Sequence, residues 1–417
     1  MIRYGIVGVG GFASRYLQAL GALEQTGVAR LAAAVVRNPD KYAPQVAALK
    51  SKGCVIYATL DEMLTQGRGR IDIVGVPTGI AQHAPMSKRA MEAGYPVLME
   101  KPVAATIQEV SDLRRVERRT GRWCAVGYQF IYSSTIQWLK EKLLEGRLGA
   151  IREARTAIGW PRGTGYYARN PWAAQLQAEG RWVLDGPATN ATAHHLTNML
   201  YLAMAQRDGK EDISSVRAEL YRARAVPGYD TSCIEVTLSD GARLLHYATH
   251  ALDQAVEPFT DYMCERGTIR WEAEGNVAVI RYDDGTSERH AGHTGPDLHL
   301  RLFEQVSHVV EGKEPTPLCG LAEGEPHVLT IDLAFESSGG ITTIPAAHTY
   351  EGMAGDGTAA TCVKGMRELL LAAQEQGVLF SELGVPWAKP TAPVAAAGYE
   401  WFPRNPDLPR ALGVEAL

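Results

Sequence analysis

Two short stretches of this sequence have the residue types and spacing that chemistry at a bound ligand requires. Gly8-Val9-Gly10-Gly11-Phe12-Ala13 is rich in glycine and opens a helical pattern, and Glu100-Lys101-Pro102 follows a short apolar run. The backbone N–H groups of a glycine-rich turn can hold a phosphate at the positive end of a helix. A lysine held in place can stabilise negative charge that develops on a substrate oxygen. Together the two stretches indicate an enzyme that acts beside a bound dinucleotide.

The glycine-rich turn reads G-x-G-x-x-A, after the apolar run Ile2–Val7 and at the start of the helical pattern Phe12–Leu23. In such a turn Gly8 permits the sharp bend, Gly10 lets N–H groups approach a pyrophosphate, and Ala13 allows close helix packing. A plain turn is the alternative, but the strand before it and the helix after it favour dinucleotide binding. The expected contacts come from Gly8, Gly10, Gly11, Phe12 and Ala13.

The end of the second predicted strand, Leu31–Val36, indicates which dinucleotide binds. An acidic residue there would hold the ribose 2′-hydroxyl of NAD, and the sequence has no acidic residue between Glu24 and Asp40. Arg37 follows the strand and can pair with a 2′-phosphate through two hydrogen bonds. NADP is therefore favoured over NAD. The alternative is that Arg37 is a solvated loop charge and that Asp40 reaches the ribose of NAD.

Lys101 is predicted to lie at the carboxyl end of a parallel strand, because it follows the apolar run Val97–Met99 and Glu100. Ligands of open α/β sheets bind at that edge. Pro102 has a fixed φ and restricts the residue before it, so Lys101 is directed rather than free. We expect Lys101 to hydrogen-bond a substrate hydroxyl and to stabilise the oxyanion as hydride leaves. A surface ion pair between Glu100 and Lys101 is the alternative, and the position after this strand makes it the less favoured one.

The first third of the chain alternates short apolar runs with helical patterns. Runs at Ile71–Val76 and Val97–Met99, with helical patterns at Asp61–Thr65 and Pro85–Ala93, imply βαβ units with right-handed crossovers. Apolar strands of this kind suit a sheet covered on both faces. The predicted fold class over residues 1–125 is an α/β Rossmann domain with a doubly wound parallel sheet.

From residue 126 the character changes, and strands with period-two patterning follow one another. The expected domain over residues 126–385 is α+β with an antiparallel sheet, and residues 386–417 form a tail that either frays or docks on a neighbouring surface. Asp240-Gly241 and Asp284-Gly285 predict hairpins with type I′ turns. The strands are expected at Ile151–Ile158, Val216–Tyr221, Ser232–Leu238 and Arg243–Thr249.

The composition excludes several classes of protein. The 417 residues include 42 basic and 47 acidic side chains, for a formal charge of −5, which argues against a nucleic-acid partner held by phosphate contacts. No apolar stretch reaches the roughly 18 residues of a membrane-spanning helix, so no membrane partner is expected. The six scattered cysteines, with no C-x-x-C pair, are expected to be reduced thiols of a cytoplasmic protein.

Three motifs together resemble the Gfo/Idh/MocA family, the NAD(P)-dependent enzymes related to glucose–fructose oxidoreductase and inositol dehydrogenase. They are the G-x-G-x-x-A turn, Pro77-Thr78 with His83, and Glu100-Lys101-Pro102. The resemblance covers roughly the first 380 residues and is strongest up to Phe130. It implies a second domain with an open, mostly antiparallel sheet that covers the active site and commonly serves in oligomerisation, so a dimer or tetramer is expected. It also implies cofactor contacts from Pro77, Thr78, His83, Glu100 and Lys101.

Members of this family carry D-x-x-x-H at the start of a helix, where the Asp holds the substrate and the His exchanges a proton. The matching residues here are Asn190 and His194, so an amide replaces the carboxylate. Positions four apart lie on one helix face, so both side chains can address one ligand. Asn190 can hydrogen-bond a hydroxyl but cannot raise the pKa of a nearby histidine by charge. His194 is the expected acid or base, and the adjacent His195 the expected structural histidine.

The segment Gly159–Leu184 is too long for a plain connection and is rich in aromatic and guanidinium groups. Such groups would suit a polyhydroxylated or anionic carbohydrate, although a surface loop pinned by aromatic rings is an equally supported alternative. No metal is expected at His246, His250, His290 or His293, because no acid or cysteine of matching spacing lies nearby. The predicted substrate contacts are Asn190, Tyr128, Arg162, Tyr166, Arg169 and Trp172, with Trp160 and Tyr167 in the same segment.

These expectations describe an NADP- or NAD-dependent oxidoreductase that moves hydride between the nicotinamide and a secondary alcohol or ketone carbon of a sugar, sugar derivative or cyclitol. Lys101 would polarise the oxygen whose proton His194 exchanges. One rival keeps the cofactor but cleaves a glycoside through transient oxidation of the sugar, and Asn190 in place of a carboxylate leaves room for it. A second rival is a non-catalytic regulator that binds the dinucleotide, against which Lys101 and His194 argue.

Overall fold

The N-terminal part of the chain folds around a six-stranded parallel sheet. The computed structural model describes residues 1–207, 212–415 and 417. The strand order is β3-β2-β1-β4-β5-β6, with every neighbouring pair parallel, which confirms the predicted doubly wound Rossmann sheet. The last three of these strands are buried at every residue. The strands are β1 (Ile2–Val7), β2 (Ala29–Val35), β3 (Val55–Tyr57), β4 (Ile73–Val76), β5 (Val97–Met99) and β6 (Cys124–Val126).

Helices α1 and α3 follow the predicted patterns, α2 was not predicted, and the start of α4 needs a correction. The helix expected from Pro85 begins five residues earlier, because buried Ile80, Ala81 and Ala84 continue its apolar face and Pro85 lies inside it. His83 is therefore a helical residue. The connecting helices are α1 (Ala13–Gln25), the short turn η1 (Asp40–Tyr42), α2 (Ala43–Ser51), α3 (Leu60–Gln66), α4 (Ile80–Glu92) and α5 (Ile107–Thr120).

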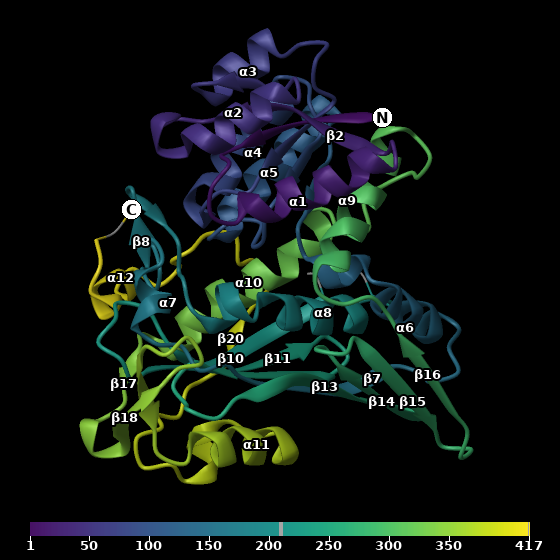
Figure 1. Cartoon of the computed structure of the whole chain (residues 1–417). Helices are drawn as coiled ribbons and strands as arrows, with labels where there is room; N and C mark the ends of the chain where they lie inside the picture. The colour runs from purple at the N-terminus through teal and green to yellow at the C-terminus, as the bar shows by residue number, and fades with distance from the viewer. Residues whose placement is uncertain (208–211, 416) are drawn as a thin grey trace. The chain divides into compact units, whose positions relative to one another are not determined.

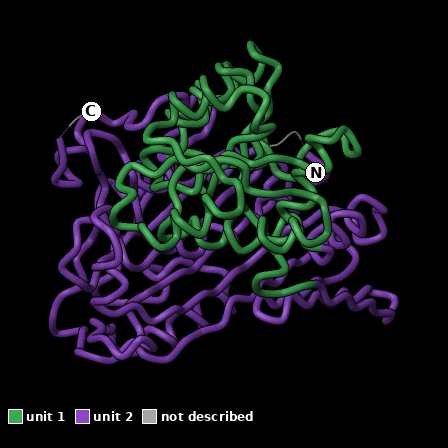
Figure 2. The backbone as a smooth tube through the Cα atoms, turned by 45° about the horizontal axis from the view of Figure 1, so that its top comes forward, with its two compact units in different colours: residues 1–104, 109–133, 293–324 green, residues 105–108, 134–292, 325–417 purple. Residues whose placement is uncertain are grey.

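A later segment completes this part of the fold. The chain divides into unit 1, which holds residues 1–104, 109–133 and 293–324, and unit 2, which holds residues 105–108, 134–292 and 325–417 (Figure 2). Within unit 1, helix α9 (Pro296–Val310) packs along α1, where the Tyr16 and Phe303 rings meet edge to face at 4.7 Å. The Tyr4 hydroxyl also lies 3.0 Å from the Ser307 hydroxyl. Nothing in the local sequence pattern assigns this helix to the parallel sheet.

Unit 2 is built on a mixed, mostly antiparallel ten-stranded sheet, as the resemblance implied. Its order is β16-β15-β14-β13-β7-β12-β11-β10-β17, with β20 beside β10, and only β7–β12 and β10–β17 are parallel. The strands are β7 (Ile151–Gly159), β10 (Ile213–Arg222), β11 (Thr231–Leu238), β12 (Arg243–Thr249), β13 (Val256–Cys264), β14 (Gly267–Glu272), β15 (Val277–Tyr282), β16 (Ser287–Ala291), β17 (Thr342–Thr343) and β20 (Val394–Ala395).

Both predicted hairpins form, but their turn type was predicted wrongly. A type I′ turn needs a positive φ at both central residues, and only Gly241 and Gly285 have one. The aspartates before them use their side chains instead. Asp240 accepts the N–H of Ala242, and Asp284 accepts the N–H of Thr286, so each turn is closed by a carboxylate.

Different helices cover the two faces of the large sheet (Figure 1). On β7, Thr156 reaches the Met199 sulfur of α8, while its neighbour Ala157 belongs to an apolar cluster with Leu370 of α11. The remaining elements are η2 (Gln129–Tyr132), α6 (Ser134–Leu144), α7 (Thr164–Ala168), β8 (Gln177–Ala178), β9 (Arg181–Trp182), η3 (Pro187–Ala191), α8 (Ala193–Ala203), α10 (Leu321–Ser338), η5 (Ala346–His348), β18 (Thr349–Met353), β19 (Ala359–Val363), α11 (Met366–Gln376), η6 (Phe380–Leu383) and α12 (Leu408–Leu412).

The face that carries α11 also carries a row of alternating charges. Glu235 of β11 pairs with Arg217 at 2.7 Å and with Arg243 at 2.5 Å, and Arg243 pairs with Glu153 at 3.0 Å. Beside this row, the apolar cluster that includes Leu370, Phe380 and Trp387 covers the strands. The chain's own C-terminal residues therefore cover much of this face.

The C-terminal tail docks on unit 2 rather than fraying. Phe402 packs against Trp182 at 5.2 Å and Phe335 at 6.2 Å, and β20 pairs with β10. The side-chain amide of Gln177 donates to the carbonyl of Glu415 at 2.7 Å. In the described ranges, none of the helices combines the length and apolar character that crossing a bilayer requires.

Candidate functional site

The glycine-rich turn in unit 1 has the backbone that an anion requires. Gly8 and Gly11 have φ values of 91° and 57°, and a side chain at either would meet nothing within 4 Å, so the turn is open on that side. Within the described residues, the N–H groups of Gly10, Gly11 and Phe12 donate to no other group. These three N–H groups lie at the start of the 13-residue helix α1, whose dipole favours negative charge there. The turn therefore fits the pyrophosphate of a dinucleotide.

Gly10 has a neighbour that sequence reasoning missed. An added Cβ at Gly10 would lie 2.4 Å from the Tyr42 hydroxyl, so a side chain at this position would displace the Tyr42 ring. The Gln45 side chain also donates to the Val9 carbonyl at 2.9 Å. The segment after β2 therefore packs against one side of the turn, and only the spacing of Tyr42 and Gln45 after the second strand could have indicated this.

The end of β2 presents Arg37 as expected. Val36 is buried, and Arg37 is exposed and makes no hydrogen bond or ion pair with any described residue. Asp40 is also exposed, at the start of η1. Both residues that could select between NADP and NAD are therefore accessible to a ligand.

His83 of α4 connects the ends of two parallel strands. Its Nδ1 lies 2.7 Å from the Pro102 carbonyl oxygen, and its Nε2 lies 3.1 Å from the Thr78 carbonyl oxygen. Burial lowers the pKa of His83 to about 4, with the Lys101 charge acting in the same direction, so the ring is neutral and has one N–H. The shorter distance assigns that N–H to Nδ1. His83 therefore donates to the Pro102 carbonyl, while its unprotonated Nε2 lies beside the Thr78 carbonyl.

Glu100 is buried directly behind Lys101. Only 5% of Glu100 is exposed, and burial raises the pKa of its carboxyl to about 7, although the Lys101 charge and the Lys101 N–H at 3.3 Å oppose the shift. An added Cβ at Gly127 would lie 2.8 Å from the Glu100 carboxylate. The absence of a side chain at Gly127 therefore leaves the space that the carboxylate occupies. The alternative of a surface ion pair between Glu100 and Lys101 is wrong for Glu100, because its carboxylate is inside the protein.

Two other predicted residues of unit 1 have packing partners. Tyr128 follows β6 and is fully buried. Phe12 lies beside His299 of α9, with ring centroids 5.8 Å apart.

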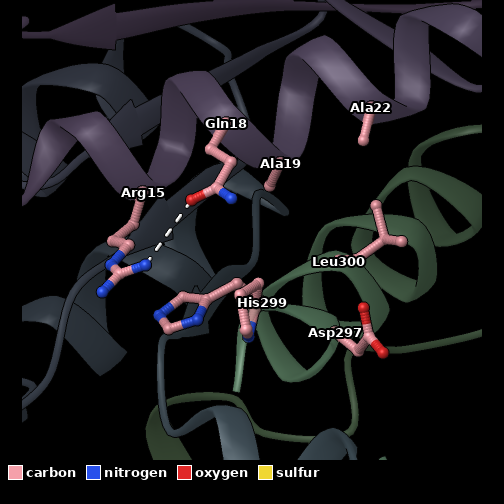
Figure 3. Close-up of a pocket in the computed structure, with 8 residues that line it drawn as sticks. Arg15, Gln18, Ala19, Ala22, Asp297, His299 and Leu300 are labelled. Carbon is pink, nitrogen blue, oxygen red and sulfur yellow. Dashed lines mark hydrogen bonds between the residues drawn. The ribbon is translucent and has the colours of Figure 1, made fainter. Parts of the chain in front are cut away.

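A small pocket lies between α1 and α9, and Arg15 and Gln18 form a 3.5 Å hydrogen bond at its edge (Figure 3). Burial lowers the pKa of His299 to about 4, so this pocket has a neutral imidazole. Neither α9 nor its pocket was predicted near the turn.

In unit 2, Asn190 is held by a carboxylate that sequence reasoning missed. The Asn190 Nδ2 donates to Asp185 Oδ1 at 2.8 Å, and the Ala174 N–H donates to Asp185 Oδ2 at 2.6 Å. Asp185 is 2% exposed. Leu184 and Ala174 have φ values of 52° and 54°, a costly conformation for residues with side chains. Two strained residues thus support one buried carboxylate.

The predicted single helix face for Asn190 and His194 is wrong. Asn190 lies in a π-helical turn, η3, and α8 begins only at Ala193 after a break at Thr192. His194 is the second residue of α8 and is 9% exposed. Hydrogen bonding to Asp185, rather than helical spacing, orients the Asn190 amide. A π-turn has no simple sequence signature, which is why the spacing rule failed.

His195 is a packed residue. Its ring lies 5.7 Å from the rings of both Trp160 and Trp271, and burial lowers its pKa to about 3. It is therefore neutral throughout the physiological range. The same is true of His246, whose pKa burial lowers to about 3 and whose Nε2 lies 3.3 Å from the Thr192 hydroxyl.

The long segment brings its predicted residues together in unit 2. Arg169 lies over the Tyr166 ring at 3.7 Å and over Trp172 at 5.6 Å, and Arg162 lies over Tyr166 at 4.8 Å. Burial raises the pKa of Tyr166 to about 12, and the Asp185 charge adds to the shift. The Arg169 guanidinium is also 3.7 Å from Asp185. The segment therefore contacts the carboxylate that holds Asn190.

His250 is a further buried residue of this cluster. It is 3% exposed, its ring meets Tyr166 edge to face at 5.2 Å, and its Nε2 has no hydrogen-bond partner among the described residues. Burial, with the charges of Arg162 and Arg169, lowers the pKa of His250 well below its usual value. In the described part of the chain no group of three or more His, Cys, Asp or Glu could hold a metal ion.

Comparison with known proteins supports the assignment of the parallel sheet. Residues 2–128 match the family described as "Oxidoreductase family, NAD-binding Rossmann fold". The chain is 30% identical over 161 residues to a dTDP-3,4-didehydro-2,6-dideoxy-alpha-D-glucose 3-reductase of Streptomyces violaceoruber, covering 38% of this chain and 45% of the relative. It is 31% identical over 170 residues to glycosyl hydrolase family 109 protein 2 of Shewanella sp. strain ANA-3, covering 37% and 36%. The chain thus spans less than half the length of these curated relatives.

A solved structure shares the fold over most of the chain. The WlbA dehydrogenase from Bordetella pertussis, crystallised with NADH and UDP-GlcNAcA, superposes with a TM-score of 0.65 at 21% identity. The match covers 81% of this chain and 96% of that one. The family match, the strand order and the open glycine turn agree. Residues 2–128 thus match an oxidoreductase family with an NAD-binding Rossmann fold, and the observed sheet has the strand order of that fold.

Proposed function

We propose that this protein is an NAD(P)-dependent oxidoreductase that acts on a secondary alcohol or ketone carbon of a sugar, sugar derivative or cyclitol. One observation carries the proposal. An open turn with three N–H groups that are unpaired among the described residues follows the carboxyl end of β1, and Lys101 follows the carboxyl end of β5 in the same sheet. Unpaired N–H groups at the start of a helix can hold an anion. The Streptomyces relative is named as a sugar reductase, which supports the same class of reaction.

Most of the predicted residues have a role in this proposal. When bound, the nicotinamide accepts or supplies the hydride. Lys101 donates a hydrogen bond to the reacting oxygen and stabilises its negative charge. His194 removes the hydroxyl proton in oxidation or supplies it in reduction. Asn190 orients the ring, with Arg162, Tyr166, Arg169 and Trp172 as further substrate contacts; Tyr128, predicted with them, is fully buried and has no surface to offer a substrate.

The proposal is tested by turnover with a panel of sugars, sugar nucleotides and cyclitols, followed by nicotinamide absorbance. Lys101→Ala and His194→Ala should each lower kcat by about 10²- to 10⁴-fold, the range that proton transfer and oxyanion stabilisation contribute, and leave cofactor binding intact. Lys88→Ala, which changes an exposed lysine of α4, is the matched control and should keep wild-type turnover. Wild-type turnover in both site variants would refute the assigned roles.

We further propose that NADP is the preferred cofactor. The support is Arg37, exposed and unpaired after β2, in a stretch without an acidic residue. Arg37→Ala should weaken NADP binding about tenfold, the loss of one charged hydrogen-bonded contact, and leave NAD binding unchanged. Titration of both cofactors by fluorescence measures this. Tighter binding of NAD than NADP by the wild type would contradict the proposal.

A dimer or tetramer stays a prediction, which light scattering would measure.

A second candidate function is a redox-neutral cleavage of glycosides. Its support is Asn190, which replaces the carboxylate of the family motif, and the relative named as a glycosyl hydrolase. With this activity an aglycone would be released while nicotinamide absorbance stays constant. With the dehydrogenase activity the absorbance changes with turnover. A nitrophenyl glycoside panel, read at both signals, separates the two. Tight cofactor binding without any turnover would instead favour the non-catalytic regulator.

A further inference from the structure

Asp185 faces an amide whose orientation it determines. A carboxylate can only accept hydrogen bonds, so the Asn190 side chain must point its Nδ2 toward Asp185, as it does at 2.8 Å. The two polar atoms of an amide diverge from the same carbon. The Asn190 Oδ1 is therefore the atom on the other arm of the amide, and it can only accept.

We propose that Asp185 is a positioning residue that directs the Asn190 Oδ1, which can only accept, toward a substrate hydroxyl. This inference rests on the proposed function, in which Asn190 orients the substrate. An alcohol donates its O–H to such an acceptor, whereas a flipped amide would present N–H groups to it. Without Asp185, both orientations of the amide would be available.

The surroundings of Asp185 show that its position is built rather than incidental. Its second oxygen accepts the Ala174 N–H at 2.6 Å and faces the Arg169 guanidinium at 3.7 Å. Ala174 has a left-handed backbone, and so does Leu184, the residue before Asp185. Strain of this kind persists only where the surrounding structure enforces it, and it is concentrated at functional sites.

The donor and acceptor pattern predicts the behaviour of three variants. In Asp185→Asn, the new amide uses its oxygen for the Ala174 N–H and points its nitrogen at position 190. Asn190 must then turn its Oδ1 toward residue 185 and present N–H groups to the substrate. In Asn190→Asp, two carboxylates face each other across the same contact. In the exchanged pair Asp185→Asn with Asn190→Asp, the amide at 185 donates to the carboxylate at 190, which still accepts from the substrate.

The test measures kcat, KM and cofactor affinity for the best substrate of the panel. Asp185→Asn should lower kcat/KM about 10- to 100-fold, the cost of one mismatched hydrogen bond in a buried site, with unchanged cofactor affinity. The exchanged pair should recover kcat/KM to within about threefold. Asp261→Asn is the matched control, because Asp261 also accepts from a side-chain amide, that of Gln374 at 2.9 Å, and it should keep wild-type values. Wild-type kinetics in Asp185→Asn, or no recovery in the exchanged pair, would overturn the proposal.

Thermal unfolding without cofactor or substrate separates this inference from the proposed function. Asn190→Asp should lose melting temperature relative to wild type as pH rises from 5 to 8, because two buried carboxylates then ionise side by side. The exchanged pair should not. A parallel fall in both variants would show that the two residues are not paired and would overturn the inference by itself. Absence of turnover in the wild type would refute the proposed function, even if this pairing is confirmed.

Discussion

Glu100 of unit 1 and Asp185 of unit 2 are both buried carboxylates, and their surroundings differ. Glu100 in unit 1 receives a hydrogen bond from the Lys101 N–H at 3.3 Å, and burial raises its pKa to about 7. Asp185 in unit 2 receives two, from the Ala174 N–H and the Asn190 amide, and faces Arg169. The exposed fractions are similar, 5% and 2%. The two carboxylates are therefore buried to a similar depth, and they differ in the hydrogen-bond donors around them.

The comparison shows two uses of a buried acid. Glu100 can take up a proton near neutral pH, so the charge beside Lys101 depends on pH. Asp185 has hydrogen-bond donors on both oxygens, so its role is to fix the geometry of a neighbouring amide.

The largest effect is expected from Asp185→Ala. It leaves the buried Ala174 N–H and the Asn190 amide without their acceptor and removes the counter-charge of Arg169. Removal of one partner from a buried, hydrogen-bonded charge costs about 4 kcal/mol of unfolding free energy. Urea denaturation at pH 7 measures it. A loss below about 1 kcal/mol would show that the carboxylate is not buried with these donors.

Glu100→Gln should change how stability depends on pH. The pKa of Glu100 is about 7 in the folded protein against an ordinary 4.5, so the wild type gains stability from the protonated acid below pH 4.5. That contribution is lost as pH rises through 7, a loss of about 3 kcal/mol at 1.36 kcal/mol for each pH unit. Gln cannot titrate, so the variant should gain on the wild type by about this amount between pH 4.5 and 8. Parallel stability curves in urea would contradict the shifted pKa.

Gly127→Ala tests the space that Glu100 occupies. The added methyl group would lie 2.8 Å from the carboxylate, and overpacking of this kind costs about 2 kcal/mol. Gly21→Ala is the matched control, because that helical glycine of α1 has nothing within 4 Å of an added methyl group. It should stabilise the protein by about 0.5–1 kcal/mol. Equal effects of the two substitutions on thermal unfolding would refute close packing at Gly127.

The smallest effect is expected from Arg169→Gln. The ion pair with Asp185 is long, at 3.7 Å, and the Arg169 side chain is 27% exposed. Water screens such a pair, so its loss should cost less than about 1 kcal/mol. Turnover on the substrate panel should fall more clearly, because Arg169 also lies over Tyr166. Stability loss as large as that of Asp185→Ala would show that the carboxylate depends on Arg169.

The two candidate regions also differ in how far sequence reasoning reached. The residues of unit 1 come in short contiguous motifs, and strand, turn and helix follow one another along the chain. Gly8, Lys101 and His83 could therefore be assigned to the turn and to the sheet edge. Their partners Tyr42, Gly127 and α9 were missed, because each comes from a distant element that packs beside the motif.

In unit 2, less of the site could be predicted. Residue types alone indicated Arg162, Tyr166 and Arg169, but their contacts with one another depend on the path of an irregular segment. Asp185 was missed because it lies outside the expected D-x-x-x-H spacing, and the π-turn at Asn190 leaves no periodic pattern to detect.

The parallel sheet, the glycine turn and the position of Lys101 could be predicted from the residues, because they follow from local periodicity and from the conformations that glycine and proline allow. The folded structure was needed to show that Asp185 supplies a carboxylate to Asn190, that Glu100 is buried, and that α9 joins the first unit. The physical reason is that burial and hydrogen-bond partners are properties of chain segments that meet in space, and no local pattern encodes which distant segment arrives.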